Sequence, residues 1–173
     1  MTLLVAYAST HGSTRGIAER VAARLRKRGH AVEISPIGAV EAVEPYRAFV
    51  LGSAIYAGSW IVDAVDFVER HRDLLAQRPV WLFSVGPLDD QGGLLRSVDW
   101  PEAKQIEPLR TAIAARDHRM FAGAIQPDKL SFLVRLIFRA SGGRYGDFRK
   151  WDEIDGWADT IADELAGDSG MDA

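Results

Sequence analysis

The stretch AYASTHGSTRGIAERVA, residues 6–22, passes from apolar residues to a run of hydroxyl residues and glycine, and then to a helical pattern. Its apolar part begins at residue 3, and the run over residues 3–8 suits a strand that is covered on both faces. After the hydroxyl residues, Ile17, Val21 and Leu25 recur at four-residue spacing. This stretch therefore predicts a strand, a loop and a helix.

The same alternation continues along the chain. Further strands are expected at residues 31–35, 46–54, 79–85 and 119–124. Helices are expected at residues 13–28, 60–76, 102–116 and 151–166. Because parallel strands need crossover connections, this alternation predicts an α/β fold: a doubly wound, five-stranded parallel sheet with helices on both faces. We expect a single domain over residues 1–166 and a flexible tail over residues 167–173.

Composition excludes several kinds of chemistry. The 173 residues carry a formal charge of -3, which provides no overall field to attract nucleic acid. The absence of cysteine excludes disulfides, thiol nucleophiles and thiolate metal sites, and the four histidines show no metal-ligand spacing. The apolar start has no basic leader, and no apolar run is long enough to span a membrane, so we expect a cytoplasmic protein.

The hydroxyl-rich loop after the first strand suits a phosphate group. A helix N-terminus offers free N–H groups and a positive dipole end, and short hydroxyls would add donors. The loop lacks the lysine of nucleotide-hydrolysing phosphate loops and the three glycines of the dinucleotide fingerprint, which favours the monophosphate of FMN. The alternative is an ordinary helix start with Ser or Thr as its N-cap. The loop residues are Ser9, Thr10, Gly12, Ser13 and Thr14.

Two later loops contain residues that suit a planar ring. After the third strand, GSAIYAGSW, residues 52–60, offers Tyr56 and Trp60 as ring contacts. The alternative places Trp60 in the core and Tyr56 on an exposed loop. After the fourth strand, the loop at residues 84–93 could line the other ring edge, where Asp89 or Asp90 would lower the reduction potential of a flavin. A solvated acidic turn is the alternative there.

These loops resemble those of the flavodoxin family. STHGST, residues 9–14, matches the family's phosphate loop, with His11 where threonine or serine is usual, so the role of His11 stays open. The resemblance is closer to one branch, the menaquinone-dependent protoporphyrinogen oxidases and their flavodoxin-domain relatives. Four segments carry it: GSAIYAGSW, FVERH, FAGAI and LIFRASGG.

The resemblance implies the strand order 2-1-3-4-5, noncovalent FMN, and electron transfer from a reduced organic donor to a quinone. It implies phosphate contacts from Ser9, Thr10, His11, Gly12, Ser13 and Thr14. It implies contacts to one side of the ring from Ala54, Ile55, Tyr56, Ala57, Gly58 and Trp60. A weaker assignment gives the other side to Ser84, Val85, Gly86, Asp89 and Gly92.

Residues 126–153 form an insertion before the last helix that small flavodoxins lack. Within it, residues 130–138 predict a strongly apolar helix, which either packs on its own sheet or, with Lys129, Arg135 and Arg139, lies at an anionic membrane surface. Arg144 and Arg149 are candidates for binding the propionates of a porphyrinogen. The alternative is that this segment only turns the chain before the last helix.

The combined interpretation is an FMN-dependent oxidoreductase similar to menaquinone-dependent protoporphyrinogen oxidase, with the flavin carrying the redox chemistry. No side chain is an evident catalytic acid or base. A flavodoxin-type electron carrier between partner proteins and an FMN-dependent NAD(P)H:quinone reductase are the alternatives, because the fold does not decide among them. The oligomeric state is not predicted, and membrane contact would be peripheral, at the inner face.

Overall fold

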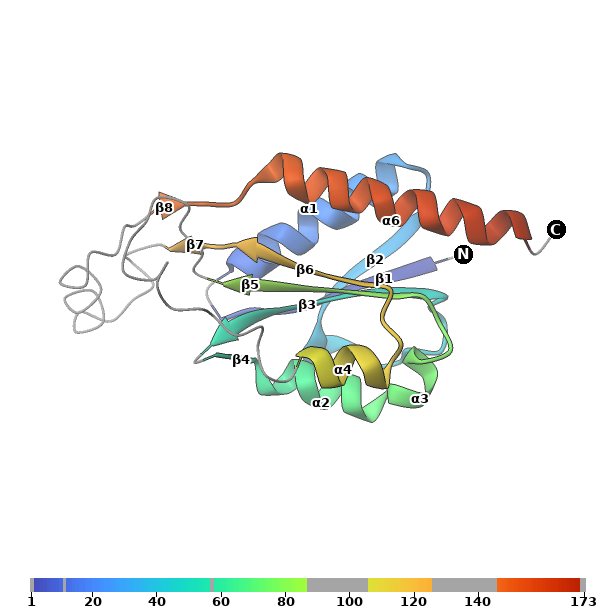
Figure 1. Cartoon of the computed structure of the whole chain (residues 1–173), viewed down its shortest axis with the longest axis horizontal. Coiled ribbons are helices and arrows are strands. Elements are labelled where there is room, and N and C mark those ends of the chain that lie inside the picture. Colours follow the sequence, from blue (N-terminus) through green and yellow to red (C-terminus); the bar gives the residue numbers. More distant parts are fainter. Residues whose placement is uncertain (1, 11, 57, 87–105, 126–145, 172–173) are drawn as a thin grey trace.

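The computed structural model (Figure 1) describes residues 2–10, 12–56, 58–86, 106–125 and 146–171. Its centre is a parallel sheet in the order β2-β1-β3-β5-β6. The long strands are β1 (Thr2–Ala8), β2 (Ala31–Pro36), β3 (Ala48–Tyr56), β5 (Val80–Gly86) and β6 (Asp117–Ala122). These five strands have the predicted order, and the difference is a short extra strand, β4 (Ser59–Trp60), which pairs antiparallel with β3.

Helices cover both faces of the sheet (Figure 1). One face carries α1 (Ser13–Lys27) and α6 (Trp151–Met171). The other face carries α2 (Val62–Arg70), α3 (Arg72–Leu75) and α4 (Ile106–Ala112), and the short 3-10 helix η1 (Ile37–Ala39) follows β2. After β6, β7 (Ala124–Ile125) pairs antiparallel with β8 (Gly146–Asp147). The predicted doubly wound α/β class is therefore confirmed.

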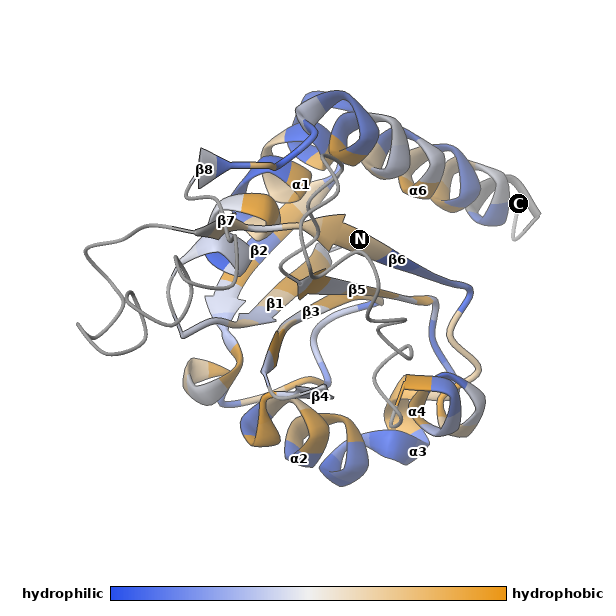
Figure 2. Cartoon of the chain, turned by 60° about the vertical axis from the view of Figure 1, so that its left-hand side comes forward, coloured by the Kyte–Doolittle hydropathy of each residue, from blue (hydrophilic) through white to orange (hydrophobic). Residues whose placement is uncertain are grey.

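The core is divided into two layers by the sheet. Strand β5 is buried along its whole length, and its side chains alternate between the layers: Trp81 and Phe83 pack with α1 and α6, whereas Leu82 packs with α2 and α4. A strand covered on both faces reads as a continuous apolar run, which is why the sequence predicted it. Figure 2 shows hydrophobic residues along the strands and on the helix faces turned toward them.

The helix predicted at residues 60–76 is wrong at its start and its middle. Trp60 pairs with Ile55 in the β3–β4 hairpin, and the Ile61 N–H donates to the Ser53 hydroxyl (3.0 Å), so α2 begins only at Val62. The helix is interrupted at His71, whose ring lies 4.8 Å from that of Phe67.

Three other elements begin or end at different residues from those predicted, and tertiary contacts accompany each difference. Strand β6 begins at Asp117 rather than residue 119, since Asp117 accepts a hydrogen bond from Trp157 Nε1 (2.9 Å). Helix α6 continues to Met171 instead of ending at residue 166, and Asp168 forms an ion pair with Arg116 (2.7 Å). Strand β3 extends to Tyr56 through its pairing with β4. The described part of the helix predicted at residues 102–116 is α4, which ends at Ala112.

Candidate cofactor site at the carboxyl edge of the sheet

The loop between β1 and α1 is shaped around Gly12. Gly12 precedes the helix in the left-handed conformation (φ 89°), which favours glycine, and its N–H donates to Ser9 Oγ (3.0 Å). The helix has no side-chain cap, so the alternative of an ordinary Ser or Thr N-cap is wrong. The first N–H groups of a helix have no acceptor within the helix, and the dipole adds positive potential there. The loop therefore presents donors suited to an anion.

Thr14 lies in the first turn of α1 and is completely buried. Its hydroxyl oxygen has no hydrogen-bond partner among the described residues. Leaving a buried hydroxyl unpaired costs about 1–3 kcal/mol, so such a group usually has a partner. An acceptor oxygen of a bound phosphate would supply that partner.

The hydrogen bonds of Ser53, a residue of β3, hold the chain on both sides of the hairpin that β3 and β4 form. This serine is completely buried, donates to the Ala54 carbonyl (2.9 Å) and accepts from the Ile61 N–H (3.0 Å). At the tip of the hairpin, Gly58 has a positive φ of 79° and Tyr56 is 68% exposed. Tyr56 therefore presents its ring at the surface of the site.

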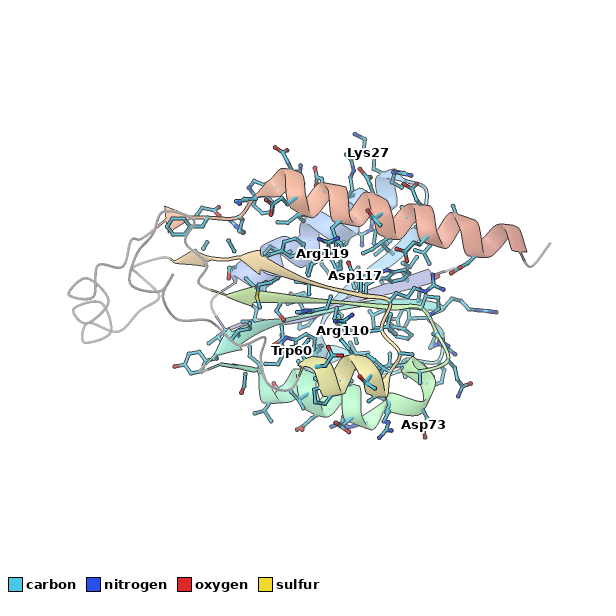
Figure 3. All side chains as sticks on the ribbon, in the orientation of Figure 1. Lys27, Trp60, Asp73, Arg110, Asp117 and Arg119 are labelled. Carbon is cyan, nitrogen blue, oxygen red and sulfur yellow. The ribbon has the colours of Figure 1, made fainter. Side chains whose placement is uncertain are left out.

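Trp60 occupies a different position from Tyr56. It is only 2% exposed and lies between the sheet and the α2–α4 layer (Figure 3). Its Nε1 donates to Ser84 Oγ (2.7 Å), which in turn lies 2.8 Å from His118 Nε2. The structure thus gives Trp60 the core position of the alternative interpretation, which leaves Tyr56 as the accessible aromatic residue of the pair.

Sequence reasoning missed this buried polar chain and the Ser53 anchor. A signal was present: Ser53 and Ser84 interrupt two otherwise apolar strands, and such positions need partners when they are buried. The His118 partner lies on β6, and no spacing rule links it to Trp60 or Ser84.

The end of β5 lies beside the hairpin. Ser84, Val85 and Gly86 are all buried, and a Cβ built on Gly86 would meet the Ile55 side chain at 3.9 Å. The residues that we predicted to contact the two edges of the ring therefore lie on the neighbouring strands β3 and β5. The remaining predicted site residues lie outside the described residues: His11, Ala57, Asp89, Gly92 and Arg144, together with the predicted helix at residues 130–138 and its flanking Lys129 and Arg139.

Arg149 contacts the first turns of α1 from the segment before α6. Its guanidinium pairs with Asp147 (2.5 Å), stacks on Trp151 (4.5 Å to the ring centroid) and lies against Gly16. The hydrogen bonds from Arg149, the largest influence, hold the pKa of Asp147 below its usual value. The Arg149 side chain is 17% exposed, so its contacts in this structure are with its own chain.

At Gly123, the chain that follows β6 passes close to the loop after β1. A Cβ at this position would lie 3.3 Å from Ser13 Oγ and 3.1 Å from Val85 Cγ1. The Gly123 carbonyl accepts from the Phe148 N–H (3.3 Å). The loop after β1 is therefore bordered by β5 and by Gly123, which precedes the insertion and is bonded to Phe148 near the insertion's end.

Together, a doubly wound parallel sheet, a hydroxyl-lined helix N-terminus and an aromatic hairpin at the next strand form an α/β domain whose carboxyl edge has groups suited to a phosphate-containing ligand. The family described as Flavodoxin domain matches residues 4–143, and the chain belongs to this family. FMN is the cofactor that this membership implies, and the unpaired Thr14 hydroxyl is compatible with a phosphate in the loop.

Solved structures share the fold. A flavodoxin from the domain Archaea is 13% identical, with a TM-score of 0.63 over 96% of this chain and 99% of that one. Oxidised flavodoxin 2 from Bacillus cereus is 21% identical, with a TM-score of 0.64 over 95% and 99%. Rubredoxin oxygen:oxidoreductase from Desulfovibrio gigas is 14% identical with a TM-score of 0.61, and the match spans 96% of this chain but 36% of that one. No curated protein sequence gives a significant match.

Flavodoxins pass electrons to redox partner proteins, so electron transfer or an oxidoreductase activity is the function that the family implies. None of the described helices is long and apolar enough to cross a membrane.

Proposed function

We propose that the loop at residues 9–14 holds the phosphate of FMN, and the observation that carries this proposal is the buried, unpaired hydroxyl of Thr14. In this arrangement Thr14 Oγ1 and the first N–H groups of α1 donate to the phosphate oxygens. Ser9 keeps its bond to Gly12 and so maintains the loop conformation. The hydroxyls of Thr10 and Ser13 complete the set of donors.

The flavin ring then lies along the carboxyl edge of β3 and β5. Tyr56 offers an exposed aromatic face on one side, and the β5 end at Gly86 forms the neighbouring wall. Bound FMN supplies the redox chemistry, and the protein orients it and limits its access to water. Ser53 and the Trp60–Ser84 hydrogen bond hold the hairpin that carries Tyr56.

The reaction that we propose is the oxidation of a reduced organic substrate with a quinone as electron acceptor, as in menaquinone-dependent protoporphyrinogen oxidases. The four sequence segments that resemble this branch support it, two of which, at residues 52–60 and 121–125, border the site.

The test is an anaerobic incubation of FMN-loaded protein with protoporphyrinogen and menadione, followed by porphyrin fluorescence. We expect a rise that depends on the flavin and on menadione. A flavin-loaded protein that produces no more porphyrin than the flavin-free control would refute this reaction while leaving FMN binding intact.

The second candidate function is electron transfer between proteins, and the extent of the structural matches favours it. Two flavodoxins match over 99% of their own length, so the match extends over the whole of a flavodoxin. A carrier predicts two well-separated one-electron potentials in a redox titration and no porphyrin product. The oxidase predicts porphyrin formation whatever the separation of the potentials.

A further inference from the structure

A cavity of about 590 Å³ opens beside the loop after β1. Its lining includes Ser9, Thr10 and Gly12, three of the residues that we assign to the phosphate of FMN. The cavity is therefore part of the proposed phosphate site, and a charged side chain in its lining can act on the phosphate at short range.

The loop itself supplies no permanent positive charge. Residues 9–14 include neither lysine nor arginine, and apart from His11 their hydrogen-bond donors are neutral. A phosphate monoester carries a charge of about -1.5 to -2 at pH 7. The helix dipole offers only about half a positive charge. A cation beside the loop would therefore add an attraction that the loop donors alone do not provide.

Arg15 is such a cation, and it lines the cavity from the first turn of α1. Among the described residues of the lining it is the only lysine or arginine, while Asp63, in the first turn of α2, adds a negative charge. Side chains on a helix lean toward the N-terminus of that helix, which for α1 is the hydroxyl loop. Arg15 therefore lies within reach of a phosphate in the loop.

The partner of Arg15 in this structure is Glu19, with 2.8 Å between Nε and Oε1. The hydrogen bond to Glu19, the largest influence, raises the pKa of Arg15, and Tyr7, another cavity residue, raises it further through its charge interaction. The two paired side chains are 63% and 51% exposed. Exposed pairs four residues apart on a helix are weak, so the guanidinium can exchange Glu19 for a more highly charged anion.

We propose that Arg15 exchanges Glu19 for the phosphate when FMN binds, and that this arginine thereby makes the site select FMN over riboflavin. The inference rests on the proposed phosphate position in the loop at residues 9–14. The planar guanidinium offers paired N–H donors, which match the oxygens of a phosphate as well as those of a carboxylate. Glu19 competes with the phosphate for Arg15, so its removal should favour FMN.

The experiment titrates apoprotein with FMN and with riboflavin by calorimetry, for the natural chain and for Arg15→Gln, Arg15→Lys and Glu19→Gln. Riboflavin lacks the phosphate, so its affinity reports any change elsewhere in the site. Arg119→Gln is the matched control, because the Arg119 side chain is 61% exposed and also pairs with a carboxylate of its own element, Asp117 (3.0 Å). Its strand, β6, contributes no described residue to the cavity. Titrations at about 50 and 500 mM salt measure the screening of the charges.

We expect Arg15→Gln to weaken FMN binding by about fivefold or more and to leave riboflavin within about twofold. Arg15→Lys should fall between the two, because lysine keeps the charge and loses the paired donors. Glu19→Gln should tighten FMN binding by about twofold, and Arg119→Gln should change neither ligand. Added salt should weaken FMN binding more in the natural chain than in Arg15→Gln.

Two results would overturn the inference while the natural chain still prefers FMN to riboflavin. One is an Arg15→Gln variant that binds FMN as tightly as the natural chain does, or that loses equal affinity for both ligands. The other is a Glu19→Gln variant that binds FMN more weakly, because Glu19 would then not be a competitor. Equal affinities of the natural chain for FMN and riboflavin would instead refute the proposed phosphate site itself.

Discussion

Thr14 places a hydroxyl where the folded chain gives it no partner among the described residues. Valine has the same shape without the hydroxyl, so Thr14→Val removes an unsatisfied group from the flavin-free protein. We expect this variant to raise the melting temperature of the apoprotein and, because a donor to the phosphate is lost, to weaken FMN binding by about tenfold or more. Thermal unfolding and calorimetric titration measure the two effects.

The opposite signs of these effects separate a ligand-binding role from a purely structural one. Thr160→Val is the control, because the Thr160 hydroxyl is exposed and bonds to its own helix at the Gly156 carbonyl (3.1 Å). That change should leave FMN affinity as it is. If Thr14→Val lowered the melting temperature and left the FMN affinity unchanged, Thr14 would be a structural residue and the proposed phosphate position would be wrong.

Ser84 is the second residue with a specific expectation. It accepts the Trp60 Nε1–H inside the core, so Ser84→Ala leaves a buried indole donor without this partner. We expect the free energy of unfolding to fall by about 1–3 kcal/mol. Urea unfolding measures it, and Ser35→Ala, which removes an exposed hydroxyl on β2, is expected to change stability by less than about 0.5 kcal/mol. Equal stabilities of the two variants would contradict this account of the Trp60 site.

Single residues also show how far the sequence alone could go. The hydroxyl loop and its glycine were recognisable from residue types, because few other uses bring so many short donors to a helix start. The sequence did not indicate which of these hydroxyls is buried and unpaired, since that depends on the packing around α1. The roles of Tyr56 and Trp60 could not be separated either, because a hairpin decides which ring faces the core.

Between helices α1 and α6, a row of ion pairs joins elements far apart in the chain. Arg20 pairs with Asp155 (2.6 Å) and Arg24 with Asp159 (2.6 Å), while Arg28 contacts both Asp159 (3.0 Å) and Asp163. Helical periodicity predicted both helices, but the pairing follows from their packing against each other. The β3–β4 hairpin was missed for a related reason: its last residue, Trp60, was included in the predicted helix, and the pairing of Ile55 with Trp60 shows that it belongs to the hairpin.

This row of ion pairs predicts that the free energy of unfolding depends on pH in the acid range. The hydrogen bond from Arg24, the largest influence, lowers the pKa of Asp159 from 3.8 to about 2. A carboxyl with a lowered pKa in the folded state stabilises fully above its unfolded pKa, and the contribution is lost as pH falls through the folded pKa. The stabilisation by Asp159 should therefore be complete above about pH 4 and decline toward pH 2.

Urea unfolding of the natural chain and of Asp159→Asn between pH 7 and pH 2 measures this contribution. We expect the stability difference between the two chains to be largest near neutral pH and to shrink as the carboxyl becomes protonated. A difference that stays constant over the whole range would contradict the ion pair. Glu41→Gln is a suitable control, because Glu41 is an exposed residue after η1 and away from these two helices.

At the scale of the whole molecule, the alternation of strands and helices predicted the parallel sheet, because each parallel return needs a crossover connection, and the resemblance to flavodoxins implied the strand order that the structure shows. Element ends were less predictable, since contacts such as Trp157 with Asp117 and Arg116 with Asp168 cross the fold. The same sheet order brings the loop after β1 and the hairpin with Tyr56 to one edge of the sheet, and this arrangement exists only in the assembled molecule.

The most direct test compares the affinities of FMN and riboflavin for the apoprotein by calorimetric titration, because the two ligands differ only by the phosphate. The account predicts that FMN binds about a hundredfold more tightly or better, which corresponds to about 2.7 kcal/mol for the phosphate contacts, and that Thr14→Val narrows the difference. Equal affinities for FMN and riboflavin would contradict the central claim that the hydroxyl loop at residues 9–14 binds the phosphate.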